Sequence, residues 1–248
     1  MRAGHYVRTT TRLLLAVLLV SAAHATPASP GKTPGIPALR WEEGAPGCTF
    51  SRDDDGKYRY GLWTGDFGVV LAVDSQELEK VRRRAQPTLG IVLSLHYRGK
   101  DSADVTPDKI TLEFVKHYHD VHAALDPDDL ATKQQKDIDA LVEETERGIR
   151  KHPEKKDEKE AVLSARQKDA AEMIEFLKTR TLRAMTLNSD HPDASGWLLF
   201  STRSKWIDNL QKQEEFVLRV PVGDRVVEFP FSLPTSEGDL ILRRRQEN

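Results

Sequence analysis

The sequence predicts a mainly β protein: an antiparallel β-sandwich into which an α-helical hairpin is inserted. On both sides of residues 126–187, apolar and polar residues alternate in short segments, which is the period of a strand with one buried face. Within residues 126–187 the apolar residues instead recur every three or four positions, the period of an amphipathic helix. Strands with one polar face indicate antiparallel pairing, because parallel strands are usually buried on both faces.

Residues 41–125 hold the first group of predicted strands. Segments 48–52 and 57–63 flank the Asp-Asp-Gly sequence at 54–56, which suits a tight hairpin turn better than a calcium loop, because the acidic residues are consecutive. Residues 67–73 are apolar and too short for a helix, and residues 75–84 predict a brief helix or an irregular crossover.

The alternation is clearest in segments 89–98 and 110–119. In the second segment Thr111, Glu113, His117 and His119 are predicted to share the polar face. The residues predicted to point inward are Leu89, Ile91, Leu93, Leu95, Tyr97, Ile110, Leu112 and Phe114.

The helical region begins at Asp126, which is predicted to cap a helix that has Pro127 in its first position. An apolar stripe follows on one face, and Glu143 with Arg147 and Glu146 with Arg150 are spaced for ion pairs on the other. The stripe consists of Leu130, Ile138, Leu141, Val142 and Ile149.

Pro153 interrupts the helical pattern, because a proline disfavours helix in the residue before it. A second helix is predicted from Pro153 through Met185. Each apolar stripe needs a partner, so the two helices are predicted to pair as an antiparallel hairpin over residues 126–187.

Residues 188–242 are predicted to complete the sandwich. Segments 197–202, 215–220 and 225–231 are rich in β-branched and aromatic residues, and prolines at 221, 230 and 234 are expected to close strands. Residues 240–242 predict a last edge strand, and residues 243–248 a charged tail.

Segments 89–98 and 108–114 together resemble adjacent strands of bacterial extracytoplasmic immunoglobulin-like domains, and segments 216–221 and 227–231 resemble their closing strands. The resemblance covers about half of the mature chain and rests on hydrophobic pattern. It implies an antiparallel immunoglobulin-like β-sandwich. It implies no activity, because this fold serves many unrelated functions.

Residues 1–25 are predicted to be a cleavable signal peptide, which places the mature protein in the periplasm or outside the cell. Arginines precede an apolar run at 13–20, and Ala23 and Ala25 supply small residues before the predicted cleavage. The run is shorter than the roughly 20 residues of a membrane-spanning helix, which argues against the alternative of an uncleaved anchor. Residues 26–40, rich in Pro and Gly, predict a linker.

Composition limits the classes of function. The chain has 37 Lys and Arg against 39 Asp and Glu, a net charge of −2, and loss of the three arginines in residues 1–25 makes it −5. This acidic balance predicts no general attraction to nucleic acid, and no membrane span is expected after signal cleavage. Cys48 is the sole cysteine, so the fold must rely on its apolar core without an intrachain disulfide.

Two functions follow as alternatives. The first is a non-enzymatic binding or assembly protein that contacts a partner protein or a second copy through the helical hairpin, since helices are a common recognition surface and no catalytic motif is evident. The second is a zinc- or copper-binding protein that uses His117, His119 and His122, with His96 as a neighbour if the two strand segments pair. The alternative without a metal is that these histidines lie on a strand face that is exposed to solvent.

Overall fold

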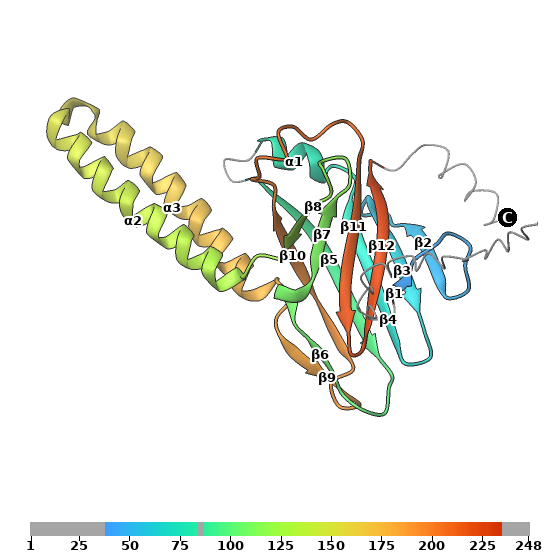
Figure 1. Cartoon of the computed structure of the whole chain (residues 1–248). Coiled ribbons are helices and arrows are strands. Elements are labelled where there is room, and N and C mark those ends of the chain that lie inside the picture. Colours follow the sequence, from blue (N-terminus) through green and yellow to red (C-terminus); the bar gives the residue numbers. More distant parts are fainter. Residues whose placement is uncertain (1–37, 84–86, 235–248) are drawn as a thin grey trace, which may run out of the picture. The chain divides into compact units, whose positions relative to one another are not determined.

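The computed structural model describes residues 38–83 and 87–234 (Figure 1). The predicted signal peptide, the predicted strand at 240–242 and the tail at 243–248 lie outside the described residues. Of the predicted linker, residues 38–40 are described and form strand β1, so that prediction extended too far toward the C-terminus.

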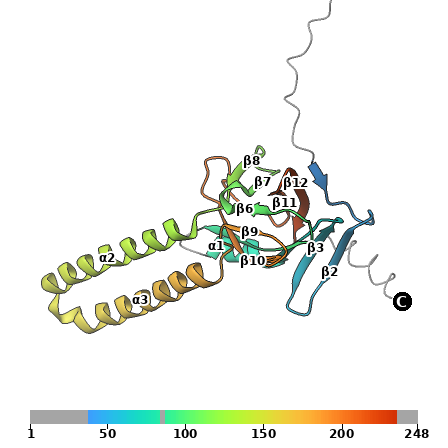
Figure 2. The same ribbon diagram turned by 90° about the horizontal axis from the view of Figure 1, so that it is seen from below.

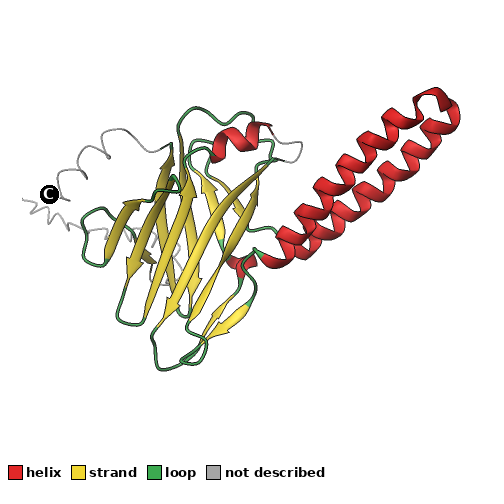
Figure 3. Cartoon of the chain, turned by 180° about the vertical axis from the view of Figure 1, so that it is seen from behind, coloured by secondary structure: helices red, strands yellow, loops and turns green. Residues whose placement is uncertain are grey.

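The described chain forms two five-stranded sheets and a small two-stranded sheet (Figure 3). Sheet A has the order β1-β12-β11-β7-β8 and sheet B the order β10-β5-β4-β3-β2, while β6 pairs with β9. The strands of sheet A are β1 (Ala38–Arg40), β12 (Arg225–Leu233), β11 (Glu214–Val222), β7 (Thr111–Phe114) and β8 (Asp120–Ala123). Those of sheet B are β10 (Asp193–Ser201), β5 (Thr88–Tyr97), β4 (Phe67–Asp74), β3 (Lys57–Trp63) and β2 (Cys48–Arg52), and the small sheet has β6 (Ala103–Val105) and β9 (Met185–Leu187).

The pairing is antiparallel except at one edge. Strand β1 runs parallel to β12, which makes sheet A mixed. Its register ends at Glu228, so β12 continues through Pro230 without β1 beside it there. Pro221 likewise lies inside β11, so the prediction that Pro221 and Pro230 close strands is wrong. A proline is tolerated where its missing N–H faces no partner strand.

The two sheets enclose one apolar core. Tyr60 of β3 and Phe231 of β12 meet between them, with ring centroids 6.1 Å apart. The predicted inward residues of segments 89–98 and 110–119 are buried, apart from the partly buried Tyr97 at the end of β5. Burial of this continuous apolar layer is the dominant favourable term in the stability of the fold.

Helix α2 (Pro127–Lys151) and helix α3 (Lys156–Thr179) form the predicted hairpin, with a single 3₁₀ turn, Pro153–Lys155, between them (Figure 2). The Asp126 carboxylate caps α2 by accepting a hydrogen bond from the Asp128 N–H at 2.7 Å, as predicted. Helix α3 ends earlier than predicted, at Thr179, and Met185 lies in β9. No helix in the described ranges is long and apolar enough to cross a membrane.

A third, short helix, α1 (Glu77–Arg83), follows β4, within the segment predicted as a brief helix or crossover. Its Glu77 side chain is 2% exposed and accepts a hydrogen bond from the Gly90 N–H at 2.8 Å. This contact holds α1 against β5, next to the hairpin base.

Candidate functional site

Both ends of the hairpin are tied to the main chain of β10. The N–H of Leu125, just before α2, donates to the Leu199 carbonyl at 2.8 Å, and the N–H of Trp197 donates to the carbonyl of Arg180, just after α3, at 2.9 Å. Arg183 and Asp128 add an ion pair at 2.9 Å. The base of the hairpin is therefore fixed to sheet B by backbone hydrogen bonds.

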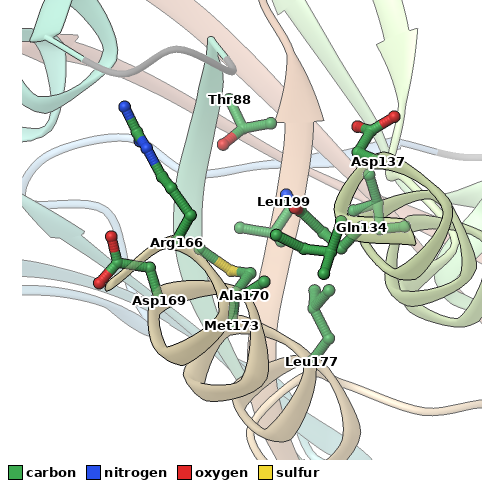
Figure 4. Close-up of a pocket in the computed structure, with 11 residues that line it drawn as sticks. Thr88, Gln134, Asp137, Arg166, Asp169, Ala170, Met173, Leu177 and Leu199 are labelled. Atoms are coloured by element: carbon green, nitrogen blue, oxygen red, sulfur yellow. The ribbon is translucent and has the colours of Figure 1, made fainter. Parts of the chain in front are cut away.

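A cavity of about 410 Å³ lies at this base (Figure 4). It lies between α2, α3 and the strands β5 and β10. Figure 4 shows Met173 and Leu177 directed from α3 toward Leu199, while the Arg166 side chain extends away from them. The lining residues are Thr88, Leu130, Gln134, Asp137, Ile138, Arg166, Asp169, Ala170, Met173, Leu177 and Leu199. The cavity thus has an apolar floor and a polar rim, the usual character of a ligand site.

A second cavity of about 410 Å³ lies beside the first and shares Thr88, Asp169, Met173 and Leu199 with it. Met173 lines both and is 37% exposed. The second cavity adds the aromatic pair Phe176 and Trp197 and the charged residues Glu77, Lys80 and Glu172. We call the two together the base cavity.

A third cavity, of about 580 Å³, lies nearer the tip of the hairpin. Its lining is Leu141, Glu144, Thr145, Arg147, Gly148, Lys151, Glu158, Lys159 and Val162. On both helices its residues continue the stripe of the first cavity at spacings of three and four. That spacing places the two cavities on the same face of the hairpin, which we call the groove face.

The seam between the two helices is only partly closed. Helix α2 has no buried residue, and α3 buries just Ala170 and Leu177. On the groove face Val162 is 58% exposed. The predicted Glu143–Arg147 ion pair is replaced by a hydrogen bond from the Arg147 side chain to the Glu143 carbonyl oxygen at 3.2 Å, and Glu146 and Arg150 form no ion pair within the described chain. The hairpin therefore presents apolar surface that the described part of the chain leaves exposed.

The three histidines of the metal hypothesis do not share a strand face. Strand β7 ends at Phe114, and the chain then turns through Tyr118 and His119, which have positive φ angles of 57° and 55°. His122 follows in β8. The prediction of one polar strand face extending to His119 was wrong because the strand stops five residues earlier.

Each histidine contacts a different carboxylate. His117 Nε2 lies 3.1 Å from a Glu214 carboxylate oxygen, and His122 Nε2 lies 2.9 Å from an Asp120 oxygen. His119 Nδ1 lies 2.5 Å from Glu113. Among the residues that the structure describes, no three His, Cys, Asp or Glu side chains are placed to hold one metal ion.

His96 does not join this group. Strand β5 lies in sheet B and β7 in sheet A, so the pairing that would have made His96 a neighbour of these histidines does not occur. His96 Nδ1 instead lies 2.7 Å from an Asp193 oxygen, and its ring stacks on Trp63. The Asp-Asp-Gly sequence forms the predicted turn, with Gly56 at φ 77°, and Cys48 is a free cysteine.

Glu113 and His117, predicted on a solvated face, are both buried. Burial by itself raises the pKa of the Glu113 carboxyl, but hydrogen bonds from His119 and Arg219 outweigh it and hold the pKa below its ordinary value. Arg219 also binds Glu228 at 2.9 Å. This network crosses β7, β11 and β12 and stabilises the outer face of sheet A.

One exposed feature was missed by the sequence patterns. Tyr118, 81% exposed, lies with its ring centroid 5.5 Å from that of Trp206, which is 45% exposed. The two residues are far apart in the chain, and the pair forms because the turn after β7 meets the loop before β11. No periodic signal marks either residue.

The geometry therefore offers two candidate sites: the base cavity and the groove face of the hairpin. Neither was identified as a pocket from the sequence, although the apolar stripes of the two helices were. Comparison of the chain with protein-family models, curated proteins and solved structures finds no match.

Proposed function

We propose that this chain is a non-enzymatic binding or assembly protein whose helical hairpin receives a helix from a partner protein or from a second copy. The observation that carries the proposal is the open seam on the groove face. An amphipathic helix binds such a face by placing residues at i, i+3, i+4 and i+7 into it.

The arrangement of the hairpin supports this function. Its base is fixed to β10, so the two helices are presented by a packed core. Toward the tip, the exposed Val162 and the half-buried Leu141 lie at the floor of the third cavity, between basic and acidic rim residues. A helix bound there would bury apolar surface that is exposed to water in the folded chain. Burial of that surface stabilises a complex by about 25 cal/mol per Å² of apolar area.

Site-specific photocrosslinking tests the proposal. A photoreactive phenylalanine analogue is placed at Val162 in the full chain, expressed in its native cell, and adducts are identified by mass spectrometry. The matched control places the same residue at Ala161, which is exposed but does not line the groove. We expect an adduct from position 162 and none from position 161.

The identity of the adduct separates the two partners. A covalent dimer of this chain means self-association, and a mixed adduct means a partner protein. The double variant Leu141→Lys/Val162→Lys is expected to abolish the complex, whereas Ala140→Lys/Ala161→Lys preserves it. Equal yields of crosslinked adduct from positions 161 and 162, or no adduct from either, would contradict the proposal.

We further propose that the sandwich is immunoglobulin-like and that the protein acts in the periplasm or outside the cell. The antiparallel pairing of the described strands other than β1 supports the first point, as does the resemblance of segments 216–221 and 227–231, which pair as β11 and β12, to the closing strands of bacterial extracytoplasmic domains. The composition of residues 1–25 supports the second. Cell fractionation, with sequencing of the mature N-terminus, tests the location; an intact first residue in the cytoplasmic fraction contradicts it.

A further inference from the structure

We propose that the base cavity is a binding site for a small organic cation with an apolar body. This inference goes beyond the hairpin's proposed partner helix, because it concerns a different ligand at the junction of α3 with sheet B. It rests on the volume of the cavity, an aromatic pair in its wall and the sign of the charges around it.

The cavity is large enough for such a molecule. Its two parts measure about 410 Å³ each and meet at Met173. Small-molecule sites usually measure 300–1,000 Å³ and have mostly apolar walls. Leu130, Leu177 and Leu199 supply apolar wall, and the flexible thioether of Met173 adapts to the shape of a guest.

An aromatic pair lies in one wall. Phe176 of α3 and Trp197 of β10 have ring centroids 5.8 Å apart and are tilted by 59°. Both rings line the second part of the cavity and are only partly buried, so each has surface left to contact a guest. The negative face of an aromatic ring attracts a cation, and tryptophan does so most strongly.

Carboxylates outnumber cations around the cavity. Its lining contains four carboxylates, from Glu77, Asp137, Asp169 and Glu172, against Lys80 and Arg166. The Lys80 ammonium group already binds the Asp74 carboxylate, and its Nζ lies 3.5 Å from a Glu77 carboxylate oxygen. In the described part of the chain Asp137 and Asp169 have no ion-pair partner, and Figure 4 shows Arg166 directed away from the apolar floor. Glu172 pairs with Lys168 at 4.0 Å, so the charged lining groups without a partner in the described chain are the carboxylates of Asp137 and Asp169 and the guanidinium of Arg166. The balance at the rim is negative, which favours a cationic guest.

Methionine NMR gives a direct test, because the chain has just three methionines. Met173 lines the cavity, whereas Met185 lies in β9 and serves as an internal control. The protein is labelled with [methyl-¹³C]methionine and titrated with benzyltrimethylammonium chloride. We expect a saturable shift of the Met173 methyl signal and an unchanged Met185 signal.

Two comparisons test the chemistry of recognition. The neutral isostere neopentylbenzene and the anion phenylacetate are expected to bind at least tenfold more weakly than the cation. Asp169→Asn is expected to weaken the cation about fivefold, whereas Glu175→Gln, on α3 but outside the lining, leaves binding unchanged. Trp197→Leu is expected to weaken it about tenfold, within the range of a desolvated cation–π contact.

The outcomes are decisive and independent of the partner helix. No Met173 shift with the cation overturns the inference, as does equal binding of the neutral isostere or equal effects of Asp169→Asn and Glu175→Gln. The double variant Leu141→Lys/Val162→Lys alters the third cavity and leaves every lining residue of the base cavity unchanged. It is expected to keep cation binding and to lose the complex with the partner helix, so failure of one proposal is distinguishable from failure of the other.

Discussion

The buried contact between His117 and Glu214 provides a quantitative test of what holds the turn after β7. Glu214 is 1% exposed; one carboxylate oxygen lies 3.1 Å from His117 Nε2 and the other accepts the N–H of Gln211. His117→Ala leaves the first oxygen buried without its donor. Leaving a buried polar atom without its hydrogen-bond partner costs about 1–3 kcal/mol, and more where the group is charged, so with the Gln211 bond still in place we expect about 3 kcal/mol.

Urea unfolding at pH 7, followed by tryptophan fluorescence, measures this cost. For slopes of about 2–3 kcal/mol per M, a loss of 3 kcal/mol lowers the midpoint by about 1 M or more. His119→Ala is the control: it also removes a histidine–carboxylate contact, but the His119 side chain is 68% exposed, so we expect a loss below about 1 kcal/mol.

A double variant separates the missing contact from simple loss of volume. His117→Leu/Glu214→Leu removes both partners and leaves no unpaired charge, so it is expected to recover most of the stability lost in His117→Ala. The reasoning is refuted if His117→Ala costs less than 1 kcal/mol, or if the double variant is as unstable as the single one.

Three further predictions concern the pH dependence of stability, a close-packed glycine and metal binding. Because the pKa of Glu113 is depressed in the folded protein, its contribution to stability is present above the ordinary Glu pKa of about 4.3 and is lost as pH falls through the folded pKa. Glu113→Gln should therefore lower stability at pH 6 and flatten its decline toward pH 3 in urea titrations; an unchanged slope contradicts this. Gly68→Ala would place a Cβ 2.2 Å from the Trp63 ring and should cost about 1–3 kcal/mol, whereas Gly65→Ala, with open space, should be near neutral by thermal unfolding. Since His117, His119 and His122 each contact a separate carboxylate, we expect untagged protein dialysed after zinc or copper loading to retain less than one equivalent by mass spectrometry; retention of a full equivalent, lost on His→Ala substitution at all three positions, would restore the metal hypothesis.

Local sequence signals predicted the elements whose causes are local. The bounds of β2 and β3 agree with the prediction because the turn between them requires the positive φ that Gly56 supplies. The start of α2 agrees because Asp126 satisfies backbone N–H groups two and three residues ahead of it. In both cases the deciding interaction lies within a few residues of the boundary.

The signals failed where a distant segment decides the structure. Alternation in the sequence continues past Phe114, yet β7 ends there and the chain reverses, so that His117 meets Glu214, 97 residues away. Strand β8, with four residues, and strands β1, β6 and β9, with three each, were not predicted, because segments this short carry little periodicity. Their pairing is set by partner strands elsewhere in the chain.

The two candidate sites show the same difference between features set by local sequence and features set by distant segments. The stripes on α2 and α3 follow from spacing, which is why the hairpin itself was predictable. The base cavity was not, because it exists only where Met173 of α3 comes to lie near Thr88 of β5 and Leu199 of β10. Which residues these side chains contact depends on how the hairpin packs against sheet B, and no local sequence pattern determines that packing.

The proposed cation site and the proposed groove site share helix α3, so binding at one would affect binding at the other. Helix α2 has no buried residue, and isolated helices are only marginally stable in water, so the arm depends on its base for a fixed orientation. The proposed guest between Met173 and Leu199 would contact α3 and sheet B at once, and it would therefore stabilise the arrangement that it binds. Because coupling between two binding sites is reciprocal, a cation bound at the proposed base site would also lower the entropy that the proposed partner helix must remove when it binds the groove face. The two proposed sites are thus linked through α3, whose Asp169 and Met173 line the base cavity while Val162, further along the same helix, lines the groove.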